Sequence, residues 1–158
     1  MEIKITAIEK ADIQKTREFC QEIFKEMEWG STFAYGLDDL KQTFSGQGEV
    51  FLVAKKGDEI IGCVGLKRLS EKIGLMKRFY IAQEFRGKGL AKLMFDEIER
   101  FAQVHGYESI VLDTYKDNER AKRFYEKQGF QSFTPSVYPA WPESGHPEIF
   151  EFKKIDLK

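Results

Sequence analysis

The 158-residue sequence predicts an α/β (α+β) fold, with a mixed, mostly antiparallel central sheet of about seven strands flanked by about four helices. Three observations predict it. Short apolar runs with strand-like alternation recur along the chain, and segments with apolar residues at helical spacing lie between them. The length suits one compact domain, residues 1–158. No repeat, low-complexity tract or Pro-, Gly- or Ser-rich linker divides the chain.

The N-terminal part is expected to hold one strand and two helices. Residues 3–7 alternate between apolar and polar side chains, which predicts the first strand. Apolar residues recur at helical spacing over residues 11–28, which predicts an amphipathic helix. The aromatic, glycine-bearing stretch 29–36 is typical of a loop. A short helix is expected after it, at residues 37–44.

The middle of the chain is expected to form three strands and a long helix. Strand-like runs at residues 50–55 and 60–68 are joined by Lys-Gly-Asp-Glu at 56–59, which favours a hairpin. A third strand is expected at residues 75–81. A strongly amphipathic helix then starts at Leu90 and ends before a glycine.

The C-terminal part supplies the remaining elements. A β-rich run at residues 110–114 predicts a strand, and residues 118–128 predict a helix. Short strands are expected around residues 130–133 and 149–155, on either side of a loop rich in proline and aromatic residues. The predicted order is therefore β-α-α-β-β-β-α-β-α-β-β.

Composition argues against several classes of partner. The 25 Lys and Arg and 26 Asp and Glu residues leave a formal net charge of -1, so neither nucleic acid nor a membrane is an expected partner. No apolar run approaches the roughly 20 residues that span a bilayer. Cys20 and Cys63 lie far apart and no secretory signal is present, which predicts reduced, buried thiols in a cytoplasmic protein with neither disulfide nor metal site.

The segment Arg86-Gly87-Lys88-Gly89-Leu90-Ala91 links a predicted strand to the long helix. Its two glycines allow a tight turn that points several N–H groups at one spot. Unpaired N–H groups and the helix dipole favour an anion there by about 0.3–1 kcal/mol. With two basic side chains nearby, a diphosphate is a natural occupant. The plainer alternative is a strand-to-helix turn solvated by two cations. The spacing is neither that of a dinucleotide fingerprint nor that of a P-loop.

A strand followed by Arg86-x-x-Gly89-x-Ala91 and a helix resembles the acetyl-CoA pyrophosphate motif of the GNAT superfamily of N-acetyltransferases. Residues 118–130, with the pattern N-x-x-A-x-x-F-Y-E-K-x-G-F, are similar to the signature of that family's last helix. The strand at residues 76–81 also resembles the family's strand before the glycine motif. The match covers roughly residues 50–133 and implies a GNAT-like fold.

The resemblance implies acetyl-CoA as cosubstrate, with no metal. The main chain of Phe79, Tyr80 and Ile81 would hydrogen-bond the pantetheine arm as another strand would. The diphosphate would lie near Arg86 on the N–H groups of the loop, which comprises Gly87, Lys88, Gly89, Leu90 and Ala91. Asn118 would hydrogen-bond the pantetheine, cap its own helix, or do both.

Tyr125 is the candidate general acid that the resemblance implies, placed to protonate the leaving thiolate. The alternative is a core aromatic residue beside Phe124. The incoming amine also has to lose a proton, and many relatives carry a glutamate where this sequence has Leu75. The base is therefore left open between Asp113, Tyr115 and a water held by backbone carbonyls.

The expected reaction moves an acetyl group from acetyl-CoA directly to a primary amine of a small molecule or peptide. Alternatives are a non-catalytic acyl-CoA-binding or regulatory module, and a phosphate binder of another fold. Glu143 and Glu148 could attract a cationic acceptor, and the family resemblance adds a possible homodimer. Aromatic residues of two loops either wall an acceptor pocket or cover the sheet ends: Trp29, Phe33, Tyr35, Tyr138, Trp141 and His146.

Overall fold

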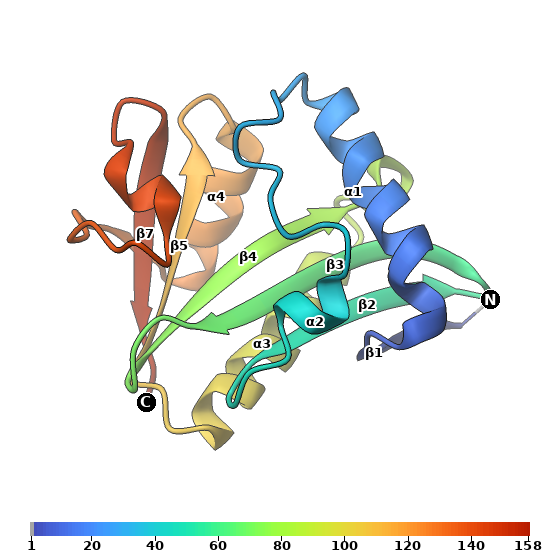
Figure 1. The fold of residues 1–158 in the computed structure, drawn as a ribbon, viewed down its shortest axis with the longest axis horizontal. Coiled ribbons are helices and arrows are strands. Elements are labelled where there is room, and N and C mark those ends of the chain that lie inside the picture. Colours follow the sequence, from blue (N-terminus) through green and yellow to red (C-terminus); the bar gives the residue numbers. More distant parts are fainter. Residues whose placement is uncertain (1) are drawn as a thin grey trace.

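A computed structural model describes residues 2–158 as one seven-stranded sheet with helices on both faces (Figure 1). The strands are β1 (Ile3–Ala7), β2 (Val50–Lys56), β3 (Glu59–Arg68), β4 (Ile73–Ile81), β5 (Ser109–Tyr115), β6 (Gln131–Ser132) and β7 (Phe150–Asp156). The helices are α1 (Ile13–Glu26), α2 (Leu40–Thr43), α3 (Leu90–Val104) and α4 (Glu119–Gln128). Short 3-10 turns are η1 (Lys10–Asp12), η2 (Gln83–Phe85) and η3 (Pro142–Gly145). The predicted fold class is confirmed.

The sheet has the order β1-β2-β3-β4-β5-β7-β6, and its neighbouring strands are antiparallel except β4 and β5. That parallel pair is short. It joins Ile73 to Ser109, Gly74 to Ile110 and Leu75 to Val111, and then ends. Beyond Leu75 the two strands separate, so the edge of β4 that faces β5 is left without a partner strand (Figure 1). This split positions the site described below.

Two layers of helix cover the sheet. Helices α3 and α4 lie behind it in the view of Figure 1, and α1 and α2 lie in front. The α3 side of the core includes Met94 and Ile98. The α1 side includes Cys20, Phe24 and Cys63, and the buried free thiols agree with the prediction for both cysteines. A third cluster surrounds Trp141 over β5 and β7.

The predicted elements are present, with changes at their ends. The first helix starts with the turn η1 rather than at residue 11, and Asp12 joins the two parts. The second helix is only Leu40–Thr43, because the Asp39 side chain caps it by accepting from the N–H of Gln42. The turn η3 was missed by the sequence reasoning, and it proves to carry a residue of the site.

Strand β4 contains a bulge opposite Cys63 and Gly65 of β3, where three steps along β4 match two along β3. Arg78 sits in the bulge with φ 57°, a left-handed conformation unusual for a residue with a side chain. The bulge changes the alternation of side chains, so that both Lys77 and Arg78 reach groups on the α1 side of the sheet. Phe79 then packs on the α3 side, against Phe124.

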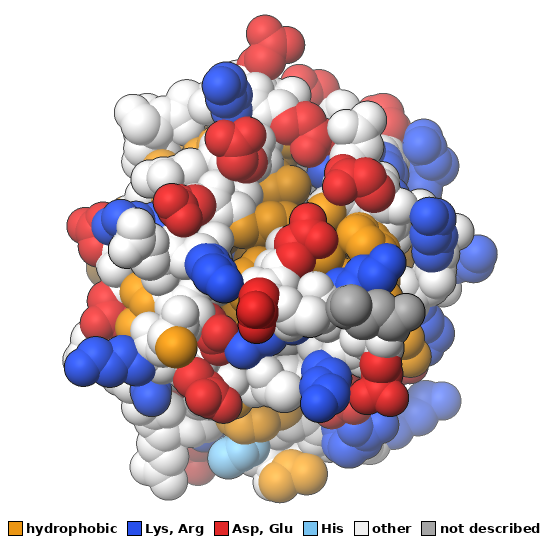
Figure 2. All heavy atoms as spheres, turned by 90° about the vertical axis from the view of Figure 1, so that its right-hand side faces the viewer, with side chains coloured by type: hydrophobic (Ala, Val, Ile, Leu, Met, Phe, Trp, Pro, Cys, Tyr) orange, Lys and Arg blue, Asp and Glu red, His pale blue; other side chains and the backbone are white. Residues whose placement is uncertain are grey.

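Figure 2 shows a face of the molecule on which acidic and basic side chains are interspersed, with apolar side chains between them. No helix within residues 2–158 is long and apolar enough to cross a bilayer.

Candidate active site

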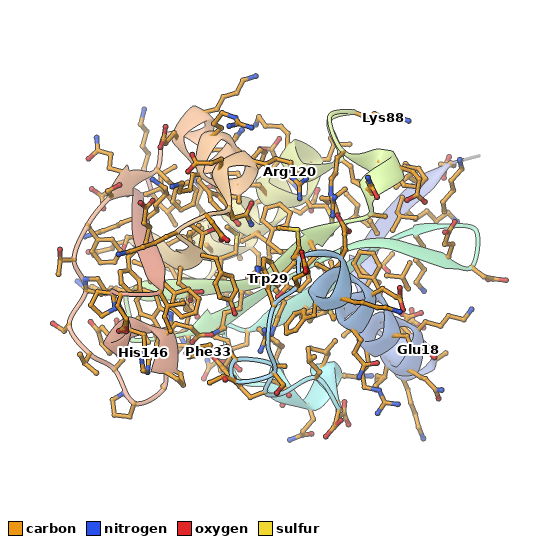
Figure 3. All side chains as sticks on the ribbon, turned by 90° about the horizontal axis from the view of Figure 1, so that it is seen from above. Glu18, Trp29, Phe33, Lys88, Arg120 and His146 are labelled. Carbon is orange, nitrogen blue, oxygen red and sulfur yellow. The ribbon has the colours of Figure 1, made fainter. Side chains whose placement is uncertain are left out.

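A groove of about 830 Å³ opens where β4 ends, between α1, α4 and the first turn of α3. Most of the cofactor residues expected from the sequence line it: Phe79, Tyr80, Ile81, Arg86, Gly87, Gly89, Ala91 and Asn118, together with Tyr125. Two expected residues do not. The side chain of Leu90 is buried in the core, and Lys88 lies on the outer loop (Figure 3). For both, the expectation concerned main-chain N–H groups.

The glycine loop has the geometry of an anion site. Gly87 and Gly89 have φ of 74° and 89°, in the left-handed region that glycine adopts without strain. Gly89 precedes the first helical residue of α3. The N–H groups of residues 87–92 have no hydrogen-bond acceptor among residues 2–158. A helix N-terminus with several free donors favours a negatively charged group.

Arg86 lines the groove, but its guanidinium is engaged within the protein. Nε donates to the carbonyl oxygen of Ile81 at 2.9 Å, and both terminal nitrogens bind the carboxylate of Glu26, with Nη2 to Oε1 at 3.0 Å. The hydrogen bond from Arg86 lowers the pKa of Glu26. The sequence reasoning treated Arg86 as a free charge near the diphosphate. In the fold it joins the end of β4 to the end of α1.

Three basic residues of α4 line the groove and were missed by the sequence reasoning: Arg120, Arg123 and Lys127. None has a carboxylate within ion-pair distance in the part of the chain that the structure describes. Burial, and next the charge of Arg86, lower the pKa of Arg120, whose side chain extends from α4 toward Met27 (Figure 3). Their spacing of three and four residues, which places side chains on one helix face, was the available signal.

Asn118 and Tyr125 lie where the groove meets a second cavity. The Asn118 side chain accepts from the N–H of Ala121 at 3.2 Å, so its predicted role as helix cap is confirmed. Tyr125 is buried between Phe79 and Phe130, and its hydroxyl has no hydrogen-bond partner within residues 2–158. Burial, reinforced by the charge of Asp113, raises the pKa of Tyr125, which therefore stays protonated at neutral pH.

The second cavity, of about 80 Å³, lies in the split between β4 and β5. It shares part of its wall with the groove: Trp29, Phe79, Tyr80, Asn118, Ala121 and Tyr125. The rest of its wall comes from α1, the loop after α1, β4, β5, η3 and β7 and includes Phe24, Phe33, Lys77, Asp113, Tyr115, Glu143 and Phe150. A molecule in this cavity would therefore meet one in the groove beside Tyr125.

A buried ionic cluster forms one side of this cavity. Lys77 Nζ lies 2.8 Å from Glu143 Oε2, and Tyr35 donates its hydroxyl to Glu143 Oε1 at 2.6 Å. Lys77 also hydrogen-bonds the Tyr35 hydroxyl. Glu143, which the sequence suggested could attract a cationic acceptor, is only 3% exposed, and its charge is matched by Lys77. Arg78 donates to the carbonyl oxygens of Phe33 and Tyr35 and so holds the loop that follows α1.

Asp113 lies in the same cavity wall. Its Oδ2 accepts a hydrogen bond from the indole Nε1–H of Trp141 at 2.7 Å. Burial raises the pKa of Asp113 to about 6, while the nearby Lys77 lowers it and Glu143 raises it. The group therefore changes charge close to neutral pH.

The aromatic residues expected at the acceptor side divide into two groups. Trp29 and Phe33 line the cavity, as the pocket interpretation requires. Tyr138, Trp141 and His146 are not part of its wall: Trp141 is fully buried over the sheet, and Tyr138 packs beside it with ring centroids 6.3 Å apart. Tyr35 is also outside the wall, and its hydroxyl donates to Glu143, which lines the cavity. Two wall residues that the sequence reasoning did not place in the pocket, Phe24 and Phe150, come from α1 and β7.

The other positions considered for a base behave differently from Asp113. Leu75 is 1% exposed and packs in the core at the end of the parallel pair, so no carboxylate enters the split there. Tyr115 stacks on Trp29 with centroids 4.8 Å apart, and burial raises its pKa. Residues 2–158 contain no cluster of three or more His, Cys, Asp or Glu side chains arranged to hold a metal.

Comparison with known sequences gives a family match. The model of the acetyltransferase (GNAT) family matches residues 15–130. An uncharacterized N-acetyltransferase of Bacillus subtilis, YsnE, is 35% identical over 128 residues, which cover 79% of this chain and 80% of that protein. Human N-acetyltransferase 8 is 28% identical over 109 residues, covering 66% of this chain. The match spans only about half, 48%, of the human protein.

Solved structures share the fold. A GNAT-family acetyltransferase from Staphylococcus aureus superposes with a TM-score of 0.85 at 21% identity, covering 99% of this chain and all of the other. The PaiA N-acetyltransferase of Thermoplasma acidophilum, solved in complex with coenzyme A, gives a TM-score of 0.79 at 20% identity over 99% of each chain.

Proposed function

The chain belongs to the GNAT family of acetyltransferases, and from that membership we propose that it moves an acetyl group from acetyl-CoA directly to a primary amine of a small molecule or peptide. One observation carries the proposal. The groove, with its free N–H groups and the unpaired cations of α4, adjoins a partly acidic cavity, and the wall that the two share includes the buried Tyr125. A donor in the groove and an acceptor in the cavity would then meet at one point.

Groups along the groove support acetyl-CoA as its ligand. The unpaired edge of β4 at residues 79–81 offers main-chain groups to the amide-bearing pantetheine arm. The free N–H groups of residues 87–92 suit the diphosphate, and Arg120 and Arg123 supply positive charge beside it. Asn118, which also caps α4, borders the path between the two cavities.

Tyr125 is assigned as the acid that protonates the leaving thiolate. Its raised pKa keeps the hydroxyl protonated and therefore able to donate. A phenol with an ordinary pKa of about 10 is a weaker acid than a thiol with an ordinary pKa of about 8.5. The same burial that raises the pKa of the phenol would raise that of a thiol lying beside it, which keeps the two close to matched.

The proposal is tested by measuring thiol release from acetyl-CoA with a panel of amines: n-butylamine, phenethylamine, spermidine, free amino acids, and short peptides with a free N-terminus or a lysine. At least one amine should give turnover and an acetylated product by mass spectrometry. Acetyl-CoA binding without turnover for the whole panel would support a binding module instead. Tight ATP binding without acetyl-CoA binding would support a phosphate binder.

The role of Tyr125 is tested by Tyr125→Phe with Tyr138→Phe as the matched control, since Tyr138 lies outside both cavities. Loss of the acid should lower kcat by about 100-fold or more, with the acetyl-CoA dissociation constant changed less than about twofold. Tyr138→Phe should retain wild-type turnover. Equal kcat values for the two variants would contradict the assignment.

A further inference from the structure

We propose that Asp113 is the general base that takes the proton of the acceptor amine, and that Trp141 is the positioning residue that orients it. The proposal rests on the acetyl transfer proposed above and names the group that fills the role left open by Leu75. Four features of the structure support it: the place of Asp113 in the sheet, its free oxygen, its charged surroundings, and the absence of a better candidate in the cavity wall.

The sheet places Asp113 at the point where β4 and β5 separate. Leu75 and Val111 form the last pair of the parallel ladder. Asp113 lies two residues beyond Val111 of that last pair, and since side chains alternate along a strand it lies on the same face as Val111. Its side chain therefore faces the space that opens in the split, and it lines the small cavity there. The paired β7 presents Phe152 beside it, an apolar neighbour.

One oxygen of Asp113 is held and the other is free. Oδ2 accepts the Trp141 indole hydrogen bond at 2.7 Å, and Trp141 is fully buried against Phe152, with ring centroids 5.6 Å apart and planes at 90°. Oδ1 has no hydrogen-bond partner among the described residues, and it is not among their fully buried unpartnered atoms. Oδ1 therefore keeps some accessible surface, and Asp113 lines the cavity in which the acceptor amine would lie.

Charged and titratable groups surround Asp113 from every packed element. Lys77 and Arg78 come from β4, Tyr35 from the loop after α1, and Glu143 from η3. Tyr115 lies on its own strand, and Tyr125 on α4. Burial dominates and raises the pKa of Asp113 to about 6, so the carboxylate is ionised at neutral pH yet more basic than an ordinary aspartate.

The other groups near the cavity are less suited to the role. Both oxygens of Glu143 are occupied, one by Tyr35 and one by Lys77. Tyr80 and Tyr115 have raised pKa values and stay protonated, so they cannot accept a proton at neutral pH. Neither histidine is part of the cavity wall.

Proton transfers accompany each bond change of the proposed step. The ammonium group of the acceptor gives one proton to the Asp113 carboxylate, and the free amine forms a C–N bond to the thioester carbon. As the C–S bond breaks, its electron pair leaves on sulfur and the thiolate takes the Tyr125 hydroxyl proton. The second proton of the nitrogen restores the Tyr125 hydroxyl, and Asp113 releases its proton to solvent. The products are the N-acetyl amine, free thiol and one proton.

The test measures kcat/KM against pH for wild type, Asp113→Asn and Asp117→Asn, using the best amine of the panel above. Asp117 is the matched control, an exposed aspartate outside both cavities. Wild type and Asp117→Asn should rise with pH to a plateau, with a midpoint near 6. Asp113→Asn should be about 100-fold slower at pH 7 and should keep rising toward the pKa of the amine itself, about 10.

Trp141→Phe keeps an aromatic ring at this buried position but removes the hydrogen bond to the ionised form of Asp113, together with part of the buried ring system. It should move the wild-type midpoint upward by about one pH unit, an effect that a purely structural role would not produce. Aspartate labelled with 13C at the carboxyl gives a readout independent of the acceptor. One resonance should titrate near pH 6 in wild type and be absent from Asp113→Asn.

The outcomes separate the two proposals. If wild type binds acetyl-CoA but none of the amines in the panel gives thiol release, the proposed function fails and the role of Asp113 fails with it. If wild type turns over but Asp113→Asn has the same pH profile, only the role of Asp113 is overturned. Should Asp113→Asn not fold, a wild-type profile without a limb near pH 6 would overturn it equally.

Discussion

The groove and the small cavity meet at Tyr125 but are built by opposite means. The groove presents free main-chain N–H groups from the glycine loop, and α4 adds three cations without carboxylate partners among the described residues. The cavity is walled by side chains whose charges are already matched, with Lys77 paired to Glu143 and one oxygen of Asp113 held by Trp141. A region of the first kind suits a ligand with fixed charge. A region of the second kind suits a ligand that matches its shape and that gives a proton to, or takes one from, a particular side chain.

This difference predicts that changes in the cavity affect folding, whereas changes in the groove affect binding. The cavity charges are buried and satisfied by partners distant in sequence, so the fold depends on them. The three cations that α4 gives to the groove have no carboxylate partner to lose in the described part of the chain.

Glu143→Gln should produce the largest loss of stability. It leaves Lys77 buried without a matching charge, which costs about 3–5 kcal/mol. In a protein of this size the melting temperature should fall by about 6–20 °C, measured by calorimetry. Glu148→Gln is the matched control, because Glu148 is exposed and contacts only His146 among the ion pairs of the described residues. Equal melting temperatures for Glu143→Gln and Glu148→Gln would contradict the prediction that changes in the cavity affect folding.

Asp113→Asn should stabilise the fold, in a way that depends on pH. The pKa of Asp113 is raised from an ordinary value near 3.9 to about 6, so the native state resists its ionisation. The contribution of Asp113 to the free energy of unfolding is therefore present in full below about pH 4 and is lost as the pH rises through about 6. With allowance for contact with the cavity, Asp113→Asn should exceed wild type by about 1–3 kcal/mol at pH 8.

Urea denaturation at pH 4 and pH 8 checks this prediction. The advantage of Asp113→Asn should be confined to the higher pH, and Asp117→Asn should match wild type at both. An advantage of Asp113→Asn at pH 4 equal to that at pH 8 would show that ionisation is not its cause.

Arg120→Ala should have the smallest effect, and on binding alone. Removing one cation from the groove should weaken acetyl-CoA binding by about 1 kcal/mol, or roughly fivefold, at low salt. The loss should shrink as salt is added, because screening weakens the interaction. Titration calorimetry measures it, with Arg100→Ala as control: Arg100 lies on α3 outside the groove. A fall in melting temperature without a change in affinity would reverse the contrast.

The same contrast explains what the sequence could predict. The strand, glycine loop and helix at residues 75–104 are determined by local patterns, so their order and the loop's free donors could be predicted. The ionic cluster could not, because Lys77 and Glu143 are 66 residues apart and meet only through the turn η3. Nor could the bulge at Arg78, since nothing local marks that residue for a left-handed conformation.

Arg86 shows how a local pattern can indicate the right place and the wrong partner. Its guanidinium binds Glu26, 60 residues earlier in the chain, and the carbonyl oxygen of Ile81. A substitution at position 26 that removes the carboxylate leaves Arg86 without its ion-pair partner. Among descendants of the same ancestor, positions 26 and 86 should therefore change together. The glycines at 87 and 89 are required by their own backbone conformation, so they can stay unchanged whether or not the pair at positions 26 and 86 is kept.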